Sequence, residues 1–141
     1  MVERILVPFD GSPKSVDALD LVFDHFPDAA VTALYVIEVP DGRWAQAVGP
    51  ELQVPVTDRH REYAEELFES ARNRADAHGR ELDTAVVTGE PDHRIVERAE
   101  AESVDLIVIG SHGREGISRI LLGSVAEKVV RRSPVSVLVV R

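Results

Sequence analysis

The sequence predicts an α/β protein with a three-layer α/β/α architecture, in which a doubly wound parallel sheet carries helices on both faces. Short apolar runs alternate four times with longer segments whose apolar residues recur at helical spacing, and a fifth apolar run ends the chain. The runs are continuously apolar, which is typical of strands covered on both faces. Five parallel strands and four intervening helices follow from this pattern.

The first strand is predicted over residues 4–9 (RILVPF), and it ends at Asp10. Ser12 is a residue type that caps helix N-termini, and Pro13 suits the first turn of the helix that follows. Pro27 ends this helix, because proline cannot continue the pattern. Its buried face is predicted from residues at helical spacing: Val16, Leu19, Val22, Phe23 and Phe26.

The second strand is predicted over residues 30–39 (AVTALYVIEV). Residues 40–56 hold three prolines and form the least regular segment, which is longer than most connections in compact domains. A long amphipathic helix begins at Thr57–Asp58, and Gly79 fits its end. Its predicted buried face consists of Tyr63, Ala64, Leu67, Phe68, Ala71 and Ala75.

The remaining elements follow the same alternation. The third strand is predicted over residues 82–88, and a short helix begins at Pro91. The fourth strand covers residues 106–109, the fourth helix begins at Ser124, and the fifth strand covers residues 135–140. The inward-facing residues are Ile95, Val96 and Ala99 in the third helix, and Ala126, Val129 and Val130 in the fourth.

A glycine-rich segment between the fourth strand and the fourth helix is the candidate binding site. Gly110, Gly113, Gly123 and Ser124 stand in the spacing G-x2-G-x9-G-S. Glycines let the backbone approach a ligand closely, and a helix N-terminus favours an anion, phosphate above all. We therefore predict that N–H groups of Gly113, Ser124 and Val125 face phosphates, with Ser124 Oγ as a further donor. The plainer alternative is a βα loop shaped by glycines, with a serine cap.

Asp10 and Gly110 each follow a predicted strand at its carboxyl end. In doubly wound sheets, ligands bind at this edge, where the winding direction reverses. One crevice contains both residues if the first and fourth strands are neighbours. For Asp10 a plainer role is also open, because a carboxylate before a helix can accept hydrogen bonds from loop N–H groups.

Several separated motifs resemble the universal stress protein family, in its small nucleotide-binding form. They are the opening ILVPFDGSPKS, the second strand LYVIEV, the turn DLIVIGSHGREG and the closing SPVSVLVVR. ATP-binding members of that family carry G-x2-G-x9-G-[ST], which this chain reproduces as GSHG, REGISRILL and GS. The resemblance covers nearly the full length. It implies a single nucleotide-binding domain over residues 1–141, with strand order 3-2-1-4-5.

The resemblance also implies a ligand, which is ATP, or AMP or ADP, held with Mg²⁺ or Mn²⁺. Pro8 and Asp10 would lie near the nucleotide, and Asp10 would contact the ribose hydroxyls or the metal. Val36 would read the adenine edge with its backbone groups. The ribose and phosphates would be held by Gly110, Gly113, Gly123, Ser124 and Val125.

Composition argues against several classes of function. A formal net charge of −9 argues against sequence-independent nucleic-acid binding, which needs a basic face. The chain has no cysteine and so no disulfides or thiolate metal sites. No apolar run approaches the roughly 20 residues of a membrane span. The N-terminus enters a strand without the plan of a signal peptide, so the cytoplasm is the expected compartment.

Three functions remain open at this point. The favoured one is an ATP-binding regulatory protein of the stress response. The second is a slow metal-dependent ATP hydrolase or nucleotidyl-transfer enzyme, and the third is a homodimer without a ligand. The loop is not a Walker A motif, and the five histidines show no pair at metal-ligand spacing. A homodimer is expected in each case, because the last strand (VSVLVV) is an apolar edge, and the resemblance implies pairing with its copy.

Overall fold

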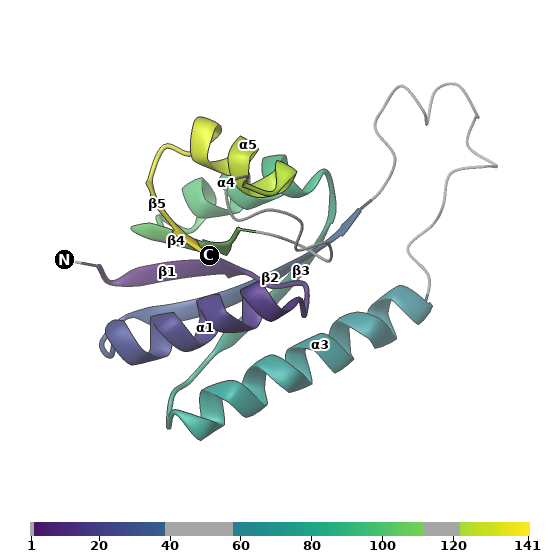
Figure 1. Cartoon of the computed structure of the whole chain (residues 1–141). Helices are drawn as coiled ribbons and strands as arrows, with labels where there is room; N and C mark the ends of the chain where they lie inside the picture. Colours follow the sequence, from purple (N-terminus) through teal and green to yellow (C-terminus); the bar gives the residue numbers. More distant parts are fainter. Residues whose placement is uncertain (1, 39–57, 112–121) are drawn as a thin grey trace.

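The computed structural model describes residues 2–38, 58–111 and 122–141 of the chain (Figure 1). Five parallel strands form one sheet in the order β3-β2-β1-β4-β5, which confirms the predicted fold class and strand order. The strands are β1 (Arg4–Pro8), β2 (Ala30–Glu38), β3 (Asp83–Gly89), β4 (Leu106–Gly110) and β5 (Ser136–Val140). The helices of the described residues are α1 (Pro13–His25), α3 (Asp58–Ala77), α4 (Pro91–Ala101) and α5 (Ser124–Arg132). The irregular segment predicted over residues 40–56 lies outside them.

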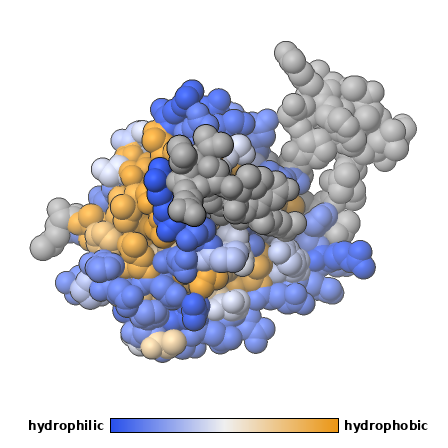
Figure 2. All heavy atoms as spheres, viewed as in Figure 1, coloured by the Kyte–Doolittle hydropathy of each residue, from blue (hydrophilic) through white to orange (hydrophobic). Residues whose placement is uncertain are grey.

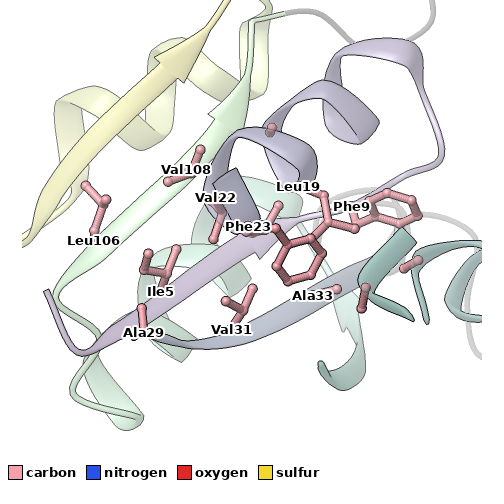
Figure 3. Packing of buried hydrophobic residues seen from close by; sticks show 14 of the residues in the cluster. Ile5, Phe9, Leu19, Val22, Phe23, Ala29, Val31, Ala33, Leu106 and Val108 are labelled. Carbon is pink, nitrogen blue, oxygen red and sulfur yellow. The ribbon is translucent and has the colours of Figure 1, made fainter. Parts of the chain in front are cut away.

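The helices form two layers, one on each face of the sheet (Figure 1). Side chains alternate between the two faces of the sheet along each strand, so each strand contributes to both clusters. Helices α1 and α3 pack against one face, and α4 and α5 pack against the other. In β1, Ile5 and Val7 join the first cluster and Leu6 joins the second. Figure 3 shows the first cluster, where Val22 and Phe23 of α1 lie over Ile5 and Val31. The predicted three-layer arrangement is confirmed.

The ends of two helices match the residues that predicted them. Ser12 is the N-cap of α1, and its hydroxyl accepts a hydrogen bond from the Ser15 N–H at 3.3 Å. Gly79 follows α3 with a φ of +66°, a conformation that suits glycine. The Arg80 N–H donates to the Ala75 carbonyl at 2.8 Å and so closes the last turn of α3.

Two residues predicted to be buried are exposed, and those predictions are wrong. Tyr63 is 38% exposed, because it lies beside the buried stripe of α3; its ring packs edge to face with that of Tyr35, with ring centroids 5.8 Å apart. Val130 is 43% exposed, because α5 covers the edge of the sheet and buries only a narrow stripe, which contains Ala126 and Val129. In the part of the chain that the structure describes, no helix is long and apolar enough to cross a membrane.

A carboxylate at the amino ends of the strands joins β1 to β4. Asp105 Oδ2 accepts hydrogen bonds from the Glu3 N–H at 2.9 Å and the Arg4 N–H at 3.0 Å. These two donors lower the pKa of Asp105, because they stabilise the ionised carboxylate. A group with a lowered pKa stabilises the fold above its unfolded pKa, and this contribution is lost as the pH falls through the folded pKa.

We therefore expect Asp105→Asn to lower stability at pH 7, and the difference from the native protein to shrink once the pH falls below about 4 and to vanish only below the lowered pKa of Asp105. Urea denaturation at pH 7, 5 and 3 measures it. Asp28→Asn, at an exposed carboxylate in the turn before β2, is the control. Equal effects of the two substitutions at pH 7 would contradict the role of Asp105.

Candidate nucleotide-binding site

The site is set by the pairing of β1 with β4. Ile5 is in register with Leu106 and Leu6 with Ile107, so these strands are direct neighbours. Because they are parallel, the loop after β1 and the loop after β4 leave the same edge of the sheet (Figure 1). The sequence left open whether the first and fourth strands are neighbours. They are, so Asp10 and Gly110 both lie at the carboxyl ends of adjacent strands.

Gly110 lies against the backbone of α1. A Cβ atom at this position would come within 2.8 Å of the Lys14 carbonyl carbon and 2.9 Å of its oxygen, closer than atoms pack. Glycine is therefore required so that the first turn of α1 can approach β4. This packing joins the loop that carries Asp10 to the strand that begins the glycine-rich segment, a role that the sequence analysis missed.

Asp10 supports its own loop. Its Oδ1 accepts a hydrogen bond from the Ser12 N–H at 2.9 Å, and the residue is half-buried. The plainer role considered for Asp10 is thus observed for one carboxylate oxygen. Among residues 2–38, 58–111 and 122–141, no group of three or more histidine, aspartate or glutamate side chains is arranged to hold a metal ion. A metal at Asp10 stays a prediction.

Helix α5 begins at this end of the strands, and its N-cap residue makes no side-chain capping hydrogen bond. Gly123 is the N-cap and Ser124 is the first helical residue, so the alternative in which Ser124 caps the helix is wrong. The first N–H groups of a helix have no acceptor within it, and here the first helical hydrogen bond runs from the Glu127 N–H to the Gly123 carbonyl at 2.9 Å. The N–H groups of Ser124 and Val125 lie in that first turn.

Ser111 connects three elements at this edge. Its N–H donates to the Val140 carbonyl at 2.7 Å, and its carbonyl accepts from the Gly123 N–H. The residue is 2% exposed, and its Oγ has no hydrogen-bond partner within the described parts of the chain. Sequence analysis did not select Ser111, although it stands beside Gly110 in the GSHG motif.

Two other predicted site residues, Pro8 and Val36, lie on β1 and β2. Pro8 is the last residue of β1 and is in register with Leu34 of β2. The Leu34 carbonyl accepts from the Phe9 N–H at 2.8 Å, so it points toward β1. Backbone groups two residues apart in a strand point the same way, so those of Val36 also point toward β1, beyond its end and at the level of Asp10. Gly113 lies outside the described residues.

Known proteins are similar to this chain along its whole length. The model of the universal stress protein family matches residues 1–141. A universal stress protein of Methanocaldococcus jannaschii is 35% identical over 144 residues, covering all of this chain and 83% of the relative. One from Bacillus subtilis is 34% identical over 151 residues and is matched along its whole length.

Solved structures are similar over nearly the whole chain. The structure of a second M. jannaschii universal stress protein has a TM-score of 0.81 at 34% identity, covering 99% of this chain and 96% of the other. A universal stress protein solved in complex with cAMP has a TM-score of 0.74 at 26% identity, covering 99% and 97%.

The packing of Gly110 yields a prediction. Gly110→Ala should lower the free energy of unfolding by about 1 to 3 kcal/mol, because the methyl group overpacks a backbone contact that no rotamer change relieves. Chemical denaturation measures this loss, and amide NMR shifts should change around Lys14. Gly79→Ala is the contrast, because a Cβ there meets open space and any cost comes from the positive φ alone. Unchanged Lys14 shifts in Gly110→Ala would contradict the close packing.

Proposed function

Because the chain belongs to the universal stress protein family, we propose that it is a regulatory protein of the stress response that binds an adenine nucleotide. The ligand is ATP, with ADP or AMP as its shorter forms, and it lies at the carboxyl edge of the sheet between β1 and β4. One observation carries this proposal: α5 begins there without a side-chain cap, beside the loop of Asp10.

The phosphates would bind at the start of α5. Uncapped N–H groups and the positive end of the helix dipole favour an anion at this place. Gly123 has no side chain to obstruct the approach, and Ser124 and Val125 supply the first N–H groups of the helix. The exposed Ser124 hydroxyl adds a donor. Gly110 and Gly113 complete the G-x2-G-x9-G-S spacing, with Gly110 acting through its packing against α1.

The nucleoside would lie across the ends of β1 and β2. The backbone of Val36 points toward the space beyond β1, which suits hydrogen bonding to the adenine edge. Asp10 at the same level would accept from the ribose hydroxyls through Oδ2, since Oδ1 already accepts from the Ser12 N–H. Pro8 would flank the ligand. The relative solved with cAMP supports an adenine nucleotide as the class of ligand.

A divalent metal fits this site only as a companion of the phosphates. Mg²⁺ is usually held by one or two carboxylates together with substrate phosphates, and Asp10 offers one carboxylate oxygen, Oδ2, for the metal as the alternative to its ribose contact. Mg²⁺ or Mn²⁺ held in this way would neutralise phosphate charge. This donor set fits a metal brought by the nucleotide and does not fit a resident metal.

Regulation fits the site better than catalysis. A hydrolase or nucleotidyl-transfer enzyme needs a positioned base or nucleophile beside the phosphates. Asp10 is the acidic candidate, and it already supports its own loop through Oδ1. A ligand that binds one state of the glycine-rich loop more tightly than another shifts the population, and a partner protein would sense that shift in the cytoplasm.

The protein would act as a homodimer through β5. This strand is an edge of the sheet, and Leu138 on it is 37% exposed. Figure 2 shows hydrophobic atoms gathered on the side where β4 and β5 lie, between the hydrophilic surfaces of the helices. An apolar edge of this kind is normally covered or paired. Pairing of β5 with the same strand of a second copy, related by a two-fold axis, would cover this edge.

A side chain that blocks the space in front of the N-terminus of α5 should abolish ATP binding. Gly123→Val places a branched side chain at the N-cap, whose φ of −62° and ψ of 155° valine can adopt, so the fold should remain. We expect ATP affinity to fall more than tenfold by titration calorimetry, with an unchanged circular dichroism spectrum. Val130→Ala, on the exposed face of the same helix, is the control. Undiminished ATP binding by Gly123→Val would refute the assigned site.

The outward N–H of Val139 in β5 offers a test of the proposed dimer. Because the Val140 carbonyl faces β4, the backbone groups of Val139 face outward from the sheet. Val139→Pro removes an outward N–H without a loss to the β4 ladder, and light scattering should then show a monomer. Val139→Ala truncates the same side chain and keeps the N–H, so it should remain a dimer. A dimeric Val139→Pro protein would exclude pairing through β5.

A further inference from the structure

We propose that Leu67 of α3 is a positioning residue for the nucleotide site, because it holds the turn that carries Asp10 in the conformation in which the carboxylate meets the ribose. The proposal rests on the proposed function and deepens it by naming what fixes Asp10. It starts from a contact between two distant segments: Leu67 Cδ2 lies 2.5 Å from the point where a Cβ atom at Gly11 would stand.

Gly11 lies in the middle of the turn that carries Asp10, and it explains why the contact is so close. Its φ is +81°, a backbone conformation that residues with a Cβ atom rarely adopt. A Cβ atom there would also overlap the Leu67 methyl group. With no side chain at position 11, this methyl group packs directly on the backbone of the turn. The leucine therefore supports the turn from an element far away in the sequence.

Hydrogen bonds hold the two ends of the same turn. Before it, the Phe9 N–H donates to the Leu34 carbonyl at 2.8 Å, and the Phe9 side chain is buried in the cluster of Figure 3. After it, the Ser12 N–H donates to Asp10 Oδ1 at 2.9 Å. Leu67 packs between these two points, at Gly11. Because Oδ1 is bonded within the turn, the position of the other oxygen, Oδ2, follows the position of the turn.

Leu67 is itself firmly placed. It is 9% exposed and belongs to the same buried cluster as Phe9. Its neighbours on the buried face of α3, Ala64, Phe68 and Ala71, hold the helix in place. Close-packed interiors give such a side chain a defined position, and truncating it leaves a cavity that its surroundings fill only in part. A cavity beside Gly11 would let the turn shift, and a binding group is precise only when its supports are locked by packing.

The ribose provides a readout that separates positioning from a general loss of stability. In the proposed site, Asp10 Oδ2 accepts from the ribose hydroxyls, whereas the phosphates lie at the start of α5. Loosening the turn should therefore weaken the contact with the hydroxyls and spare the rest of the nucleotide. The measured quantity is the ratio of the affinities for ATP and for dideoxy-ATP, whose sugar lacks both ribose hydroxyls. The two nucleotides carry the same base and the same phosphates.

The experiment is calorimetric titration of both nucleotides, with EDTA present so that no metal contributes. A hydrogen bond to a carboxylate is worth about tenfold in affinity or more, so we expect the native protein to prefer ATP by about tenfold. Leu67→Ala should lower this ratio to about threefold or less. Leu106→Ala is the matched control, because Leu106 is 8% exposed, lies in the same cluster and begins β4 at the opposite end of the strands from Asp10. It should keep the native ratio within about twofold.

Further variants show whether Leu67 acts through Asp10. Leu67→Met conserves the volume of the side chain and should keep the native ratio. In an Asp10→Ala background, Leu67→Ala should change the ratio no further, because two residues that act through one contact are not additive. Thermal melting establishes that each variant is folded. If Leu67→Ala does not fold, Leu67→Val replaces it, since valine also lacks δ carbons, and Leu106→Val becomes the control.

The remaining outcomes overturn the proposal in distinguishable ways. If the native protein prefers ATP and Leu67→Ala keeps that preference, Leu67 does not position Asp10. An equal loss of preference in Leu67→Ala and Leu106→Ala would show an effect of core packing in general. A native protein that binds ATP and dideoxy-ATP equally has no contact between Asp10 and the ribose, so the role of Leu67 fails while nucleotide binding stands. A native protein that binds neither nucleotide overturns the proposed function as well.

Discussion

The close approach of the first turn of α1 to the end of β4 is the constraint on which the site depends. Gly110 permits it, because any side chain there would collide with the Lys14 backbone. The sheet order places β1 beside β4, so the following loops leave the same end of the strands. The glycine adds a second contact, because it lets the helix after β1 rest against the strand that precedes the glycine-rich segment. Glycine at position 110 is therefore needed both for the stability of the fold and for the geometry of the site.

Helices α1 and α5 both begin beside the carboxyl ends of the β1–β4 pair, and they differ in their N-cap residues. At α1, the Ser12 hydroxyl accepts from the Ser15 N–H, and Asp10 accepts from the Ser12 N–H. At α5, the N-cap is Gly123, which has no acceptor on its side chain. An anion would therefore meet N–H donors without a capping side chain from the N-cap residue at α5, and capped ones with a carboxylate at α1. In the proposed site, this asymmetry would orient a nucleotide with its phosphates toward α5 and its hydroxyl-bearing sugar toward Asp10.

Sequence reasoning succeeded where the cause is local. Ser12 and Gly79 act within one turn of chain, so their residue types alone predicted the helix ends. It failed where packing decides the outcome: Tyr63 is exposed because it lies beside the buried stripe of α3, and Ser111 lies where β4, β5 and α5 meet, which no local motif predicts. The strand order came from the resemblance to a family, since periodicity alone does not say which strands are neighbours.

The charge of the protein bears on how such a site can hold a polyanion. The chain carries a formal net charge of −9, which opposes the approach of a triphosphate. Lys14, the lysine beside Gly110, lies 3.6 Å from the Asp17 carboxylate, so part of its charge is already balanced. Carboxylates farther than the Debye length of about 8 Å are largely screened at physiological salt, whereas N–H groups in direct contact are not. In the proposed site, main-chain dipoles at the start of α5 would supply attraction at short range. The sequence also places Arg114 and Arg119 between Gly113 and Gly123, where they would add positive charge.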